Sequence, residues 1–271
     1  MNGRVRAPAT TANLGPGFDC AAVALGLWNE VELGEPDGRV DRGHLGVRAF
    51  ELLADPKGWS FEWTTRIPRE RGLGSSAATI ALGLVAGAAA AGVEPSVDEL
   101  LALGLPLEGH PDNLAAALAG GVVAVVDGRV TRLADNAPAE PIALVPEEHV
   151  HTGKARAALP DSVPHADAAF TAGHAVLLGA ALATCSTELF ARAAADRLHE
   201  PYRAGTAPLL EAVRERLPES ALAVTLSGSG PTVIVWSRPQ DVDACIAELE
   251  ARFPDTTILP LTTTPSGAAA V

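Results

Sequence analysis

Two short segments of the chain gather residues that could bind or transfer charged groups. Residues 72–77 read Gly-Leu-Gly-Ser-Ser-Ala and lead into a long apolar, alanine-rich run. A helix that begins here presents unsatisfied backbone N–H groups and the positive end of its dipole, which together bind anions such as phosphate. The segment lacks the lysine of a Walker A loop and the third glycine of a dinucleotide loop. On residue types alone, it fits either a phosphate site or an ordinary helix cap.

The second segment, residues 108–113, reads Glu-Gly-His-Pro-Asp-Asn and directly precedes a short helix expected over residues 114–119. Asp112 alone could be the N-cap of that helix, because Asp often occupies this position. A cap does not account for Glu108, His110 and Asn113 as well. Four polar or ionisable side chains within six positions therefore indicate a functional site.

Two further segments are typical of turns. Residues 8–19 read Pro-Ala-Thr-Thr-Ala-Asn-Leu-Gly-Pro-Gly-Phe-Asp, and residues 227–231 read Ser-Gly-Ser-Gly-Pro between two apolar runs. Asn, Gly and Pro favour turns, so we expect a long turn over residues 9–19 and a tight connection at 227–231. The alternative is that the first turn presents Asn13 and Asp19 to a polar substrate.

The elements that must position these segments indicate an α+β fold, because strands and helices follow one another without regular alternation. Ser96 and Glu99 predict a capping box at the start of one helix. Residues 138–141 are expected to be a hinge between two lobes, and the small, polar residues from Thr262 onward are expected to be loose. Strands are expected over residues 25–33, 60–67, 122–126, 142–145, 222–226 and 232–236, and helices over residues 45–54, 77–91, 166–183, 187–198, 208–216 and 242–252.

The composition is that of a globular protein. The chain has 271 residues, 48% of them hydrophobic, which is enough for one large domain or two lobes. Its net charge of −13 argues against a nucleic-acid or anionic-membrane partner. The three cysteines show neither zinc spacing nor a disulfide framework. No apolar secretory segment follows Met1, so we expect a cytoplasmic protein.

The four segments resemble motifs of the GHMP kinases and occur in the same order, at residues 8–19, 72–77, 108–113 and 226–232. The first and third, with Asp-Arg-Leu-His-Glu-Pro-Tyr-Arg at residues 196–203, resemble the homoserine kinases within that superfamily. The resemblance, which runs from Val5 to about Trp236, implies ATP-dependent phosphorylation of the side-chain hydroxyl of L-homoserine. It also implies two lobes: a mixed α+β nucleotide lobe over residues 1–140 and a ferredoxin-like lobe over residues 141–271.

The resemblance further implies where the cofactors bind. The phosphates of ATP would lie against the loop residues Arg71, Gly72, Leu73, Gly74, Ser75, Ser76 and Ala77. Mg²⁺ prefers hard oxygen ligands and takes few of them from a protein. The implied ligands are Ser76 and Glu108.

The implied substrate site complements each group of L-homoserine. Asp19, helped by Asn13, would bind the ammonium group. Arg156 and Arg203 would bind the carboxylate, whose geometry a guanidinium matches, and His110 would assist there. The catalytic candidates are Arg156, Asn113 as the residue that orients the hydroxyl, and Asp112 as a possible base, although the resemblance favours proton transfer to the γ-phosphate.

Some residues depart from the usual pattern of these kinases. Thr11 stands where Ser is usual, Cys-Ala-Ala at residues 20–22 where Cys-Leu-Gly is common, and His44 where Asn is frequent. The short connection between residues 33 and 45 leaves the nucleotide preference open. Two other hypotheses are a GHMP kinase that acts on another small hydroxy amino acid and a non-catalytic paralogue that binds nucleotide or amino acid. A homodimer is implied by the resemblance alone.

Overall fold

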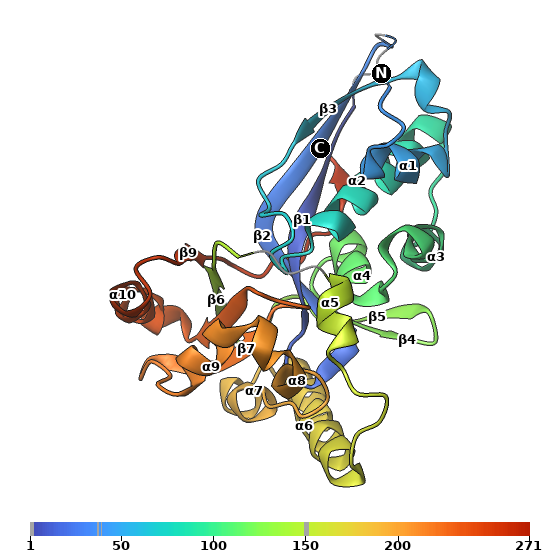
Figure 1. The fold of residues 1–271 in the computed structure, drawn as a ribbon. Coiled ribbons are helices and arrows are strands. Elements are labelled where there is room, and N and C mark those ends of the chain that lie inside the picture. The colour runs from blue at the N-terminus through green and yellow to red at the C-terminus, as the bar shows by residue number, and fades with distance from the viewer. Residues whose placement is uncertain (1–2, 37, 39, 149–151) are drawn as a thin grey trace.

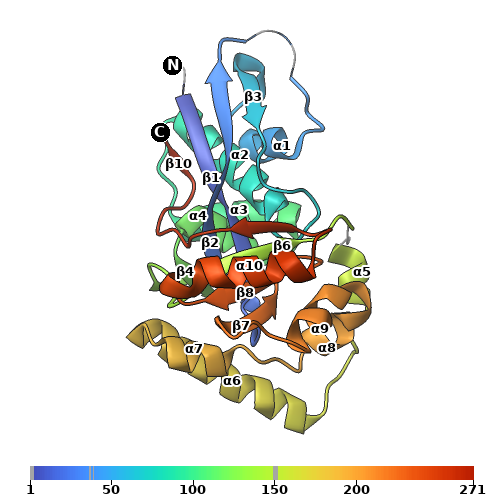
Figure 2. The same ribbon diagram turned by 90° about the vertical axis from the view of Figure 1, so that its left-hand side faces the viewer.

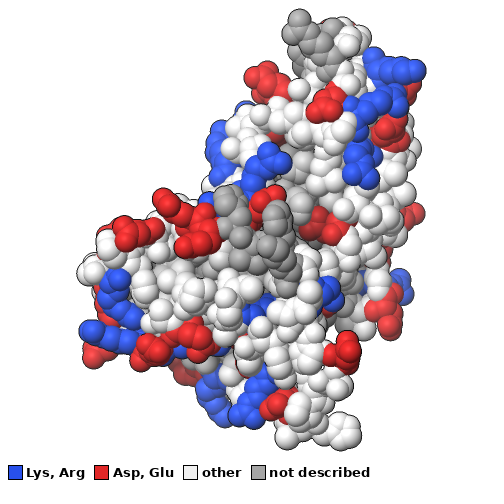
Figure 3. Space-filling view, viewed as in Figure 1, with Lys and Arg blue, Asp and Glu red and all other residues white. Residues whose placement is uncertain are grey.

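The computed structural model describes residues 3–36, 38, 40–148 and 152–271. Its strands form two antiparallel sheets with helices packed on both, so the α+β class expected from the sequence is confirmed (Figure 1). Viewed from the same side, acidic and basic side chains are interspersed over the surface (Figure 3).

The first sheet has six strands, in the order β10-β1-β2-β4-β5 with β3 paired to the C-terminal part of β2. Helices from the first half of the chain cover one face of this sheet, as Figures 1 and 2 both show. The strands are β1 (Gly3–Asn13), β2 (Gly17–Gly34), β3 (Ser60–Thr64), β4 (Val122–Val126), β5 (Arg129–Ala134) and β10 (Ala269–Ala270); the helices are α1 (Leu45–Glu51), α2 (Ser75–Ala91), α3 (Val97–Glu108) and α4 (Pro111–Ala119), and a 3₁₀ turn spans Pro56–Gly58.

Helix α2 is apolar on almost all sides because other elements surround it. Gly83 and Gly87 form a groove for α1: a Cβ at Gly83 would lie 2.1 Å from the carbonyl oxygen of Gly46. The predicted capping box is confirmed at the start of α3, where Ser96 Oγ accepts from the Glu99 N–H and Glu99 accepts from the Ser96 N–H. The rigid packing of α2 fixes the loop that precedes it.

The second sheet has four strands in the order β7-β8-β6-β9, all antiparallel. In chain order this is 2-3-1-4, the strand order of a ferredoxin-like β-α-β-β-α-β lobe. The strands are β6 (Glu140–Val145), β7 (Ala221–Leu226), β8 (Val233–Ser237) and β9 (Thr257–Pro260); the helices are α5 (Thr152–Ala157), α6 (His165–Thr184), α7 (Thr187–Ala193), α8 (Glu200–Arg203), α9 (Pro208–Arg214) and α10 (Val242–Arg252), and 3₁₀ turns span Ala204–Thr206 and Pro239–Asp241.

Both faces of this second sheet are buried, which explains why β6 and β8 are apolar at nearly every position. Ile142 and Leu144 of β6 belong to the core formed with α9 and α10. Ala143 and Val145 point the other way, into the core shared with the first sheet and with α6 and α7. Because successive side chains of a strand point to opposite faces of the sheet, alternate residues of β6 belong to two different hydrophobic cores.

The expected long turn over residues 9–19 is wrong, because β1 runs to Asn13 and β2 begins at Gly17. Ala9 and Ala12 are fully buried and pair with β2, and only residues 14–16 form the turn. Strand β5 was not predicted, since its polar residues lie on an exposed edge of the sheet.

The expectation of a loose tail is also wrong. Backbone N–H groups of Gly26 and Gly121 donate to Thr262 and Thr264, and the Val271 N–H donates to Arg4. Through these hydrogen bonds the C-terminal tail returns to the first sheet, where β10 pairs with β1. Its fixed position comes from backbone hydrogen bonds, which do not depend on side-chain type.

In the part of the chain that the structure describes, α6 is the one helix long and apolar enough to cross a membrane by length and composition. Leu178 and Leu182 of this helix are buried in the main core. Core helices of globular proteins share this length and composition, so α6 by itself does not indicate a membrane.

Candidate active site

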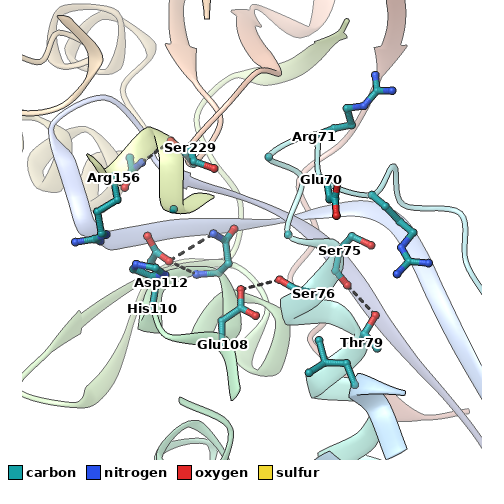
Figure 4. Close-up of a pocket in the computed structure, with 18 of the residues that line it drawn as sticks. Glu70, Arg71, Ser75, Ser76, Thr79, Glu108, His110, Asp112, Arg156 and Ser229 are labelled. Carbon is teal, nitrogen blue, oxygen red and sulfur yellow. Dashed lines mark hydrogen bonds between the residues drawn. The ribbon is translucent and has the colours of Figure 1, made fainter. Parts of the chain in front are cut away.

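A pocket of about 640 Å³ lies where the β1–β2 turn, the N-termini of α2 and α4, and helices α5 and α8 come together. Figure 4 shows side chains from the start of α2 (Ser75, Ser76), from the segment around the start of α4 (Glu108, His110, Asp112) and from α5 (Arg156) around one space. Leu73 and Ala77 are fully buried behind the loop and do not line the pocket. Every other site residue predicted from the sequence does line it: Asn13, Asp19, Arg71, Gly72, Gly74, Ser75, Ser76, Glu108, His110, Asp112, Asn113, Arg156 and Arg203.

The loop before α2 presents a free helix N-terminus to the pocket. Gly74 is the N-cap, with no hydrogen bond from a side chain, and the first helical hydrogen bond runs from the Ala78 N–H to the Gly74 oxygen. In the described structure, the N–H groups of Ser75, Ser76 and Ala77 therefore lack acceptors. This arrangement suits a phosphate group.

The two loop glycines are required by the protein itself. Gly72 and Gly74 have φ of +83° and +66°. A Cβ at Gly74 would lie 1.9 Å from Thr10 Oγ1, and one at Gly72 would lie 2.4 Å from the carbonyl oxygen of Ser227. The sequence predicted that the glycines make room for an anion; the structure adds that they make room for β1 and for the connection after β7.

Ser76 and Glu108 form a pair of hard oxygen ligands beside this helix N-terminus. Ser76 Oγ donates to Glu108 Oε1 at 2.9 Å (Figure 4). The pKa of Glu108 is raised to about 7, mainly by burial; the nearby Asp112 carboxyl contributes to this rise, and the hydrogen bond from Ser76 opposes it. No cluster of three or more His, Cys, Asp or Glu side chains that could hold a metal occurs among the described residues. A hydroxyl and one carboxylate nevertheless suit Mg²⁺, which takes one or two protein ligands alongside substrate phosphates.

Asn113 and Asp112 occupy the floor of the pocket at the start of α4. Asn113 Oδ1 accepts from Thr10 Oγ1 at 2.7 Å, which fixes the orientation of its amide. Asp112 is 4% exposed, and Oδ1 accepts from the Asn113 N–H at 2.7 Å. The helix begins at Pro111 with His110 as its N-cap, so the capping role considered for Asp112 is wrong. Burial is the main reason that the pKa of Asp112 rises to about 6.

Asn13 shapes the β1–β2 turn. Its Nδ2 donates to the Gly228 oxygen at 2.9 Å, and its Oδ1 accepts from the Asp19 N–H at 3.0 Å. Asn13, Leu14 and Asp19 all have positive φ, a conformation that non-glycine residues rarely adopt. Strain of this kind is typical of functional sites. Asp19 at the end of this turn lines the pocket.

Asp19 faces two arginines that come from the second half of the chain. Arg156 Nη2 lies 2.5 Å from Asp19 Oδ2. Arg203 is 3% exposed, and its Nη1 donates to the Gly228 oxygen at 2.9 Å. The Phe18 ring lies 5.7 Å from the Arg156 guanidinium carbon and 5.3 Å from that of Arg203. A carboxylate and two guanidinium groups thus lie close together, next to the Phe18 ring.

His110 lines the same end of the pocket, half-buried. Burial lowers the pKa of its imidazole, and the positive charge of Arg156 lowers it further. A neutral imidazole at this position can still donate or accept one hydrogen bond.

The opposite end of the pocket is lined by His44, Leu45, Thr65 and Arg69. The His44 ring packs against Trp63 with 4.3 Å between centroids and 33° between planes, and His44 Nδ1 accepts from the Gly46 N–H. An imidazole and an aliphatic side chain beyond the phosphate-binding loop form a surface suited to a flat base.

Four residues at or behind the pocket had no role predicted from the sequence: Gly228 lines the pocket, and Thr10, Phe18 and Ser227 contact residues that line it. Ser227 Oγ contacts both the Gly72 oxygen at 2.6 Å and Thr11 Oγ1 at 2.8 Å, which joins the connection after β7 to the loop before α2. All four belong to segments that were singled out as motifs. The motifs therefore indicated where these residues belong, but not which contacts each of them makes.

Comparison with known proteins gives consistent results. The model of the GHMP kinases N terminal domain matches residues 44–121, and that of the GHMP kinases C terminal region matches residues 180–255. The homoserine kinase of Streptomyces avermitilis is 41% identical over 89% of this chain and 87% of its own length. That of Streptomyces coelicolor is 42% identical over 89% of this chain and 86% of its own. The crystal structure of homoserine kinase from Cytophaga hutchinsonii superposes with a TM-score of 0.86 at 27% identity, covering all of this chain and 97% of the other.

Proposed function

The chain belongs to the homoserine kinases of the GHMP kinase family, and on that premise we propose that it transfers the γ-phosphoryl group of ATP to the side-chain hydroxyl of L-homoserine. The observation that carries this proposal is the content of one pocket. A free helix N-terminus at residues 75–77 lies in the same space as the Asp19 carboxylate and the guanidinium groups of Arg156 and Arg203. The first feature suits a polyphosphate, and the second suits the two charges of an amino acid.

In this proposal, the loop from Arg71 to Ala77 holds the triphosphate through backbone N–H groups and the dipole of α2. Ser76 and Glu108 would hold Mg²⁺, which when bound neutralises phosphate charge. The base of ATP would lie between His44 and Leu45 at the far end of the pocket.

L-Homoserine would bind between Asp19 and the two arginines. Asp19 binds the ammonium group, and Arg156 and Arg203 bind the carboxylate. His110 lines the same pocket as the two arginines and would contribute a hydrogen bond to the carboxylate. Asn13 acts through the turn, because both polar atoms of its amide are already used to hold that turn.

Asn113 would orient the attacking hydroxyl, because Thr10 holds its oxygen. The hydroxyl oxygen bonds to the γ-phosphorus while the bridging oxygen leaves with ADP. The hydroxyl proton passes to the transferred phosphoryl group. Asp112 would help to hold Asn113 in place, because its Oδ1 accepts a hydrogen bond from the Asn113 N–H. We also expect the enzyme to act in the cytoplasm, where ATP and free amino acids occur together.

The test is an ADP-release assay with Mg·ATP and, in turn, L-homoserine, L-serine, L-threonine, mevalonate and no acceptor. We expect turnover chiefly with L-homoserine. Arg203→Met should raise the KM for L-homoserine about 10- to 100-fold and leave the KM for ATP unchanged, because a charged hydrogen bond to substrate is lost. Arg192→Met removes an exposed arginine outside the pocket and is the matched control. Binding of ATP without phosphorylation of any acceptor would refute the proposal.

A further inference from the structure

His199 lies directly behind the pocket, fully buried and in contact with two parts of it. Nε2 lies 2.9 Å from the carbonyl oxygen of Gly15, in the β1–β2 turn. Nδ1 lies 3.2 Å from Nη1 of Arg203. The ring therefore bridges the turn that carries Asp19 and the arginine proposed to bind the substrate carboxylate.

The partners of the two ring nitrogens define where the proton sits. A carbonyl oxygen only accepts hydrogen bonds, so Nε2 must carry a proton to bond with Gly15. A guanidinium only donates, so Nδ1 of His199 must be unprotonated to accept from Arg203. Both bonds form together only when the imidazole is neutral and protonated on Nε2. Burial favours the neutral state as well: it lowers the pKa of His199 and outweighs the opposing effects of Glu200 and of Asp196, whose Oδ2 lies 3.6 Å from Nε2.

The surroundings hold this ring in place. The Asp196 carboxylate accepts from the backbone N–H groups of Leu198, His199 and Glu200 at 2.9, 2.8 and 3.0 Å. The Phe18 ring stacks on the imidazole, with 5.1 Å between centroids and 20° between planes. The backbone and the plane of His199 are thus both fixed from outside the pocket.

The contacts of His199 close a ring of hydrogen bonds. Gly15 bonds to His199, His199 to Arg203, and Arg203 to the Gly228 oxygen at 2.9 Å; the same oxygen accepts from Asn13, two residues before Gly15. Such a closed network sets the separation between the turn and the guanidinium. We propose that His199 is a positioning residue, which fixes Arg203 relative to Asp19 so that together they fit the two charges of an amino-acid substrate. This inference rests on the proposed function.

The kinetic test compares three replacements of His199. His199→Phe keeps an aromatic ring against Phe18 and removes both hydrogen bonds. It should raise the KM for L-homoserine about tenfold and leave the KM for ATP unchanged. His199→Asn places an amide oxygen near the Nδ1 position, where it can accept from Arg203, and should restore part of the loss. His199→Gln, which reaches only the Nε2 position, should not.

Two further measurements separate positioning from packing. The double variant His199→Phe/Arg203→Met should bind L-homoserine no worse than Arg203→Met alone, because both changes remove the same function. The KM for 3-aminopropan-1-ol, which lacks the carboxylate, should not change in His199→Phe. Additive effects in the double variant, or an equal rise in the KM for ATP, would overturn the proposal.

Nuclear magnetic resonance of the ¹⁵N-labelled full chain tests the same claim without turnover. We expect His199 to appear as the neutral form protonated on Nε2, and the Arg203 guanidinium to rotate slowly in wild type and faster in His199→Phe. An imidazolium, a ring protonated on Nδ1, or unchanged Arg203 rotation would overturn the inference. If the wild-type protein fails to phosphorylate L-homoserine, the proposed function fails, and these spectra still decide whether His199 positions Arg203.

Discussion

Replacing Asp112 by Asn should stabilise the ligand-free protein near neutral pH while slowing its turnover. Asp112 is 4% exposed, and no arginine or lysine forms a close ion pair with it in the described structure. Desolvation of the carboxylate is the main reason that its pKa rises from 3.8 to about 6, and the negative charge of Asp19 adds to the rise. The buried charge is therefore a cost to folding that a neutral side chain avoids.

The size of the effect follows from the shift in pKa. A pKa raised from 3.8 to about 6 corresponds to about 3 kcal/mol, at roughly 1.4 kcal/mol per unit. Because the folded-state pKa is the higher one, this carboxyl contributes stability below about pH 4, and that contribution is lost as the pH rises through 6. Asn cannot ionise and avoids the loss, and its side-chain oxygen can still accept from the Asn113 N–H. At pH 8 we expect about 1 to 3 kcal/mol of stabilisation, or a Tm higher by about 2 to 8 °C.

The assay is thermal unfolding of the ligand-free wild type and Asp112→Asn between pH 4 and pH 8, followed by circular dichroism. The difference in Tm should be small near pH 4, should grow between pH 4 and pH 6, where the unfolded chain is ionised and the folded one is not, and should level off above about pH 7. Asp161→Asn, at an exposed position outside the pocket, is the control and should show no such dependence. A Tm difference that does not vary with pH, or a variant less stable than wild type at pH 8, would refute the argument that Asp112 is ionised at a cost.

Three further predictions concern the rest of the site and the fold. Glu108→Gln should raise the Mg²⁺ concentration needed for half-maximal activity about tenfold or more, while the KM for L-homoserine stays constant, as a Mg²⁺ titration at fixed ATP will show. Asn113→Ala should lower kcat about 100-fold in the ADP-release assay with little change in Tm, whereas Asn136→Ala, at an exposed position, should leave kcat unaltered. Gly267→Ala should lower stability by about 2 kcal/mol or more, since its Cβ would lie 2.1 Å from the Leu118 oxygen, whereas Gly179→Ala, with open space around it, should not; equal Tm values for the two would contradict the fixed position of the tail.

The location of the pocket could be predicted because its residues are concentrated in a few short segments. Six consecutive positions contain Glu108, His110, Asp112 and Asn113, so their proximity in the sequence already places them together. The partners of these residues could not be predicted in the same way. Thr10 is 103 positions from Asn113, and only the fold brings its hydroxyl to the amide.

The errors in the predicted elements share a physical cause. Strand β1 between residues 9 and 13 consists of Ala, Thr and Asn, whose strand propensity is mixed or weak, and it is a strand because β2 pairs with it and buries it. The tail after Thr262 is fixed by hydrogen bonds to backbone groups of Gly26, Gly121 and Arg4, far away in the sequence. Local residue type cannot encode either arrangement, since both depend on partners supplied by tertiary structure.

The contact between Arg156 and Asp19 indicates what a ligand of this pocket must supply. The two side chains pair at 2.5 Å, with 42% and 34% of their side-chain surfaces exposed. A pair this exposed contributes about 1 kcal/mol or less, so a ligand can separate it at little cost. A ligand with a carboxylate alone would replace the partner of Arg156 and leave Asp19 without a cation. An amino acid replaces both partners at once, because its ammonium and carboxylate groups are joined through one carbon. The pocket should therefore discriminate against mevalonate, which carries only a negative charge, even though the phosphate-binding loop would serve either acceptor.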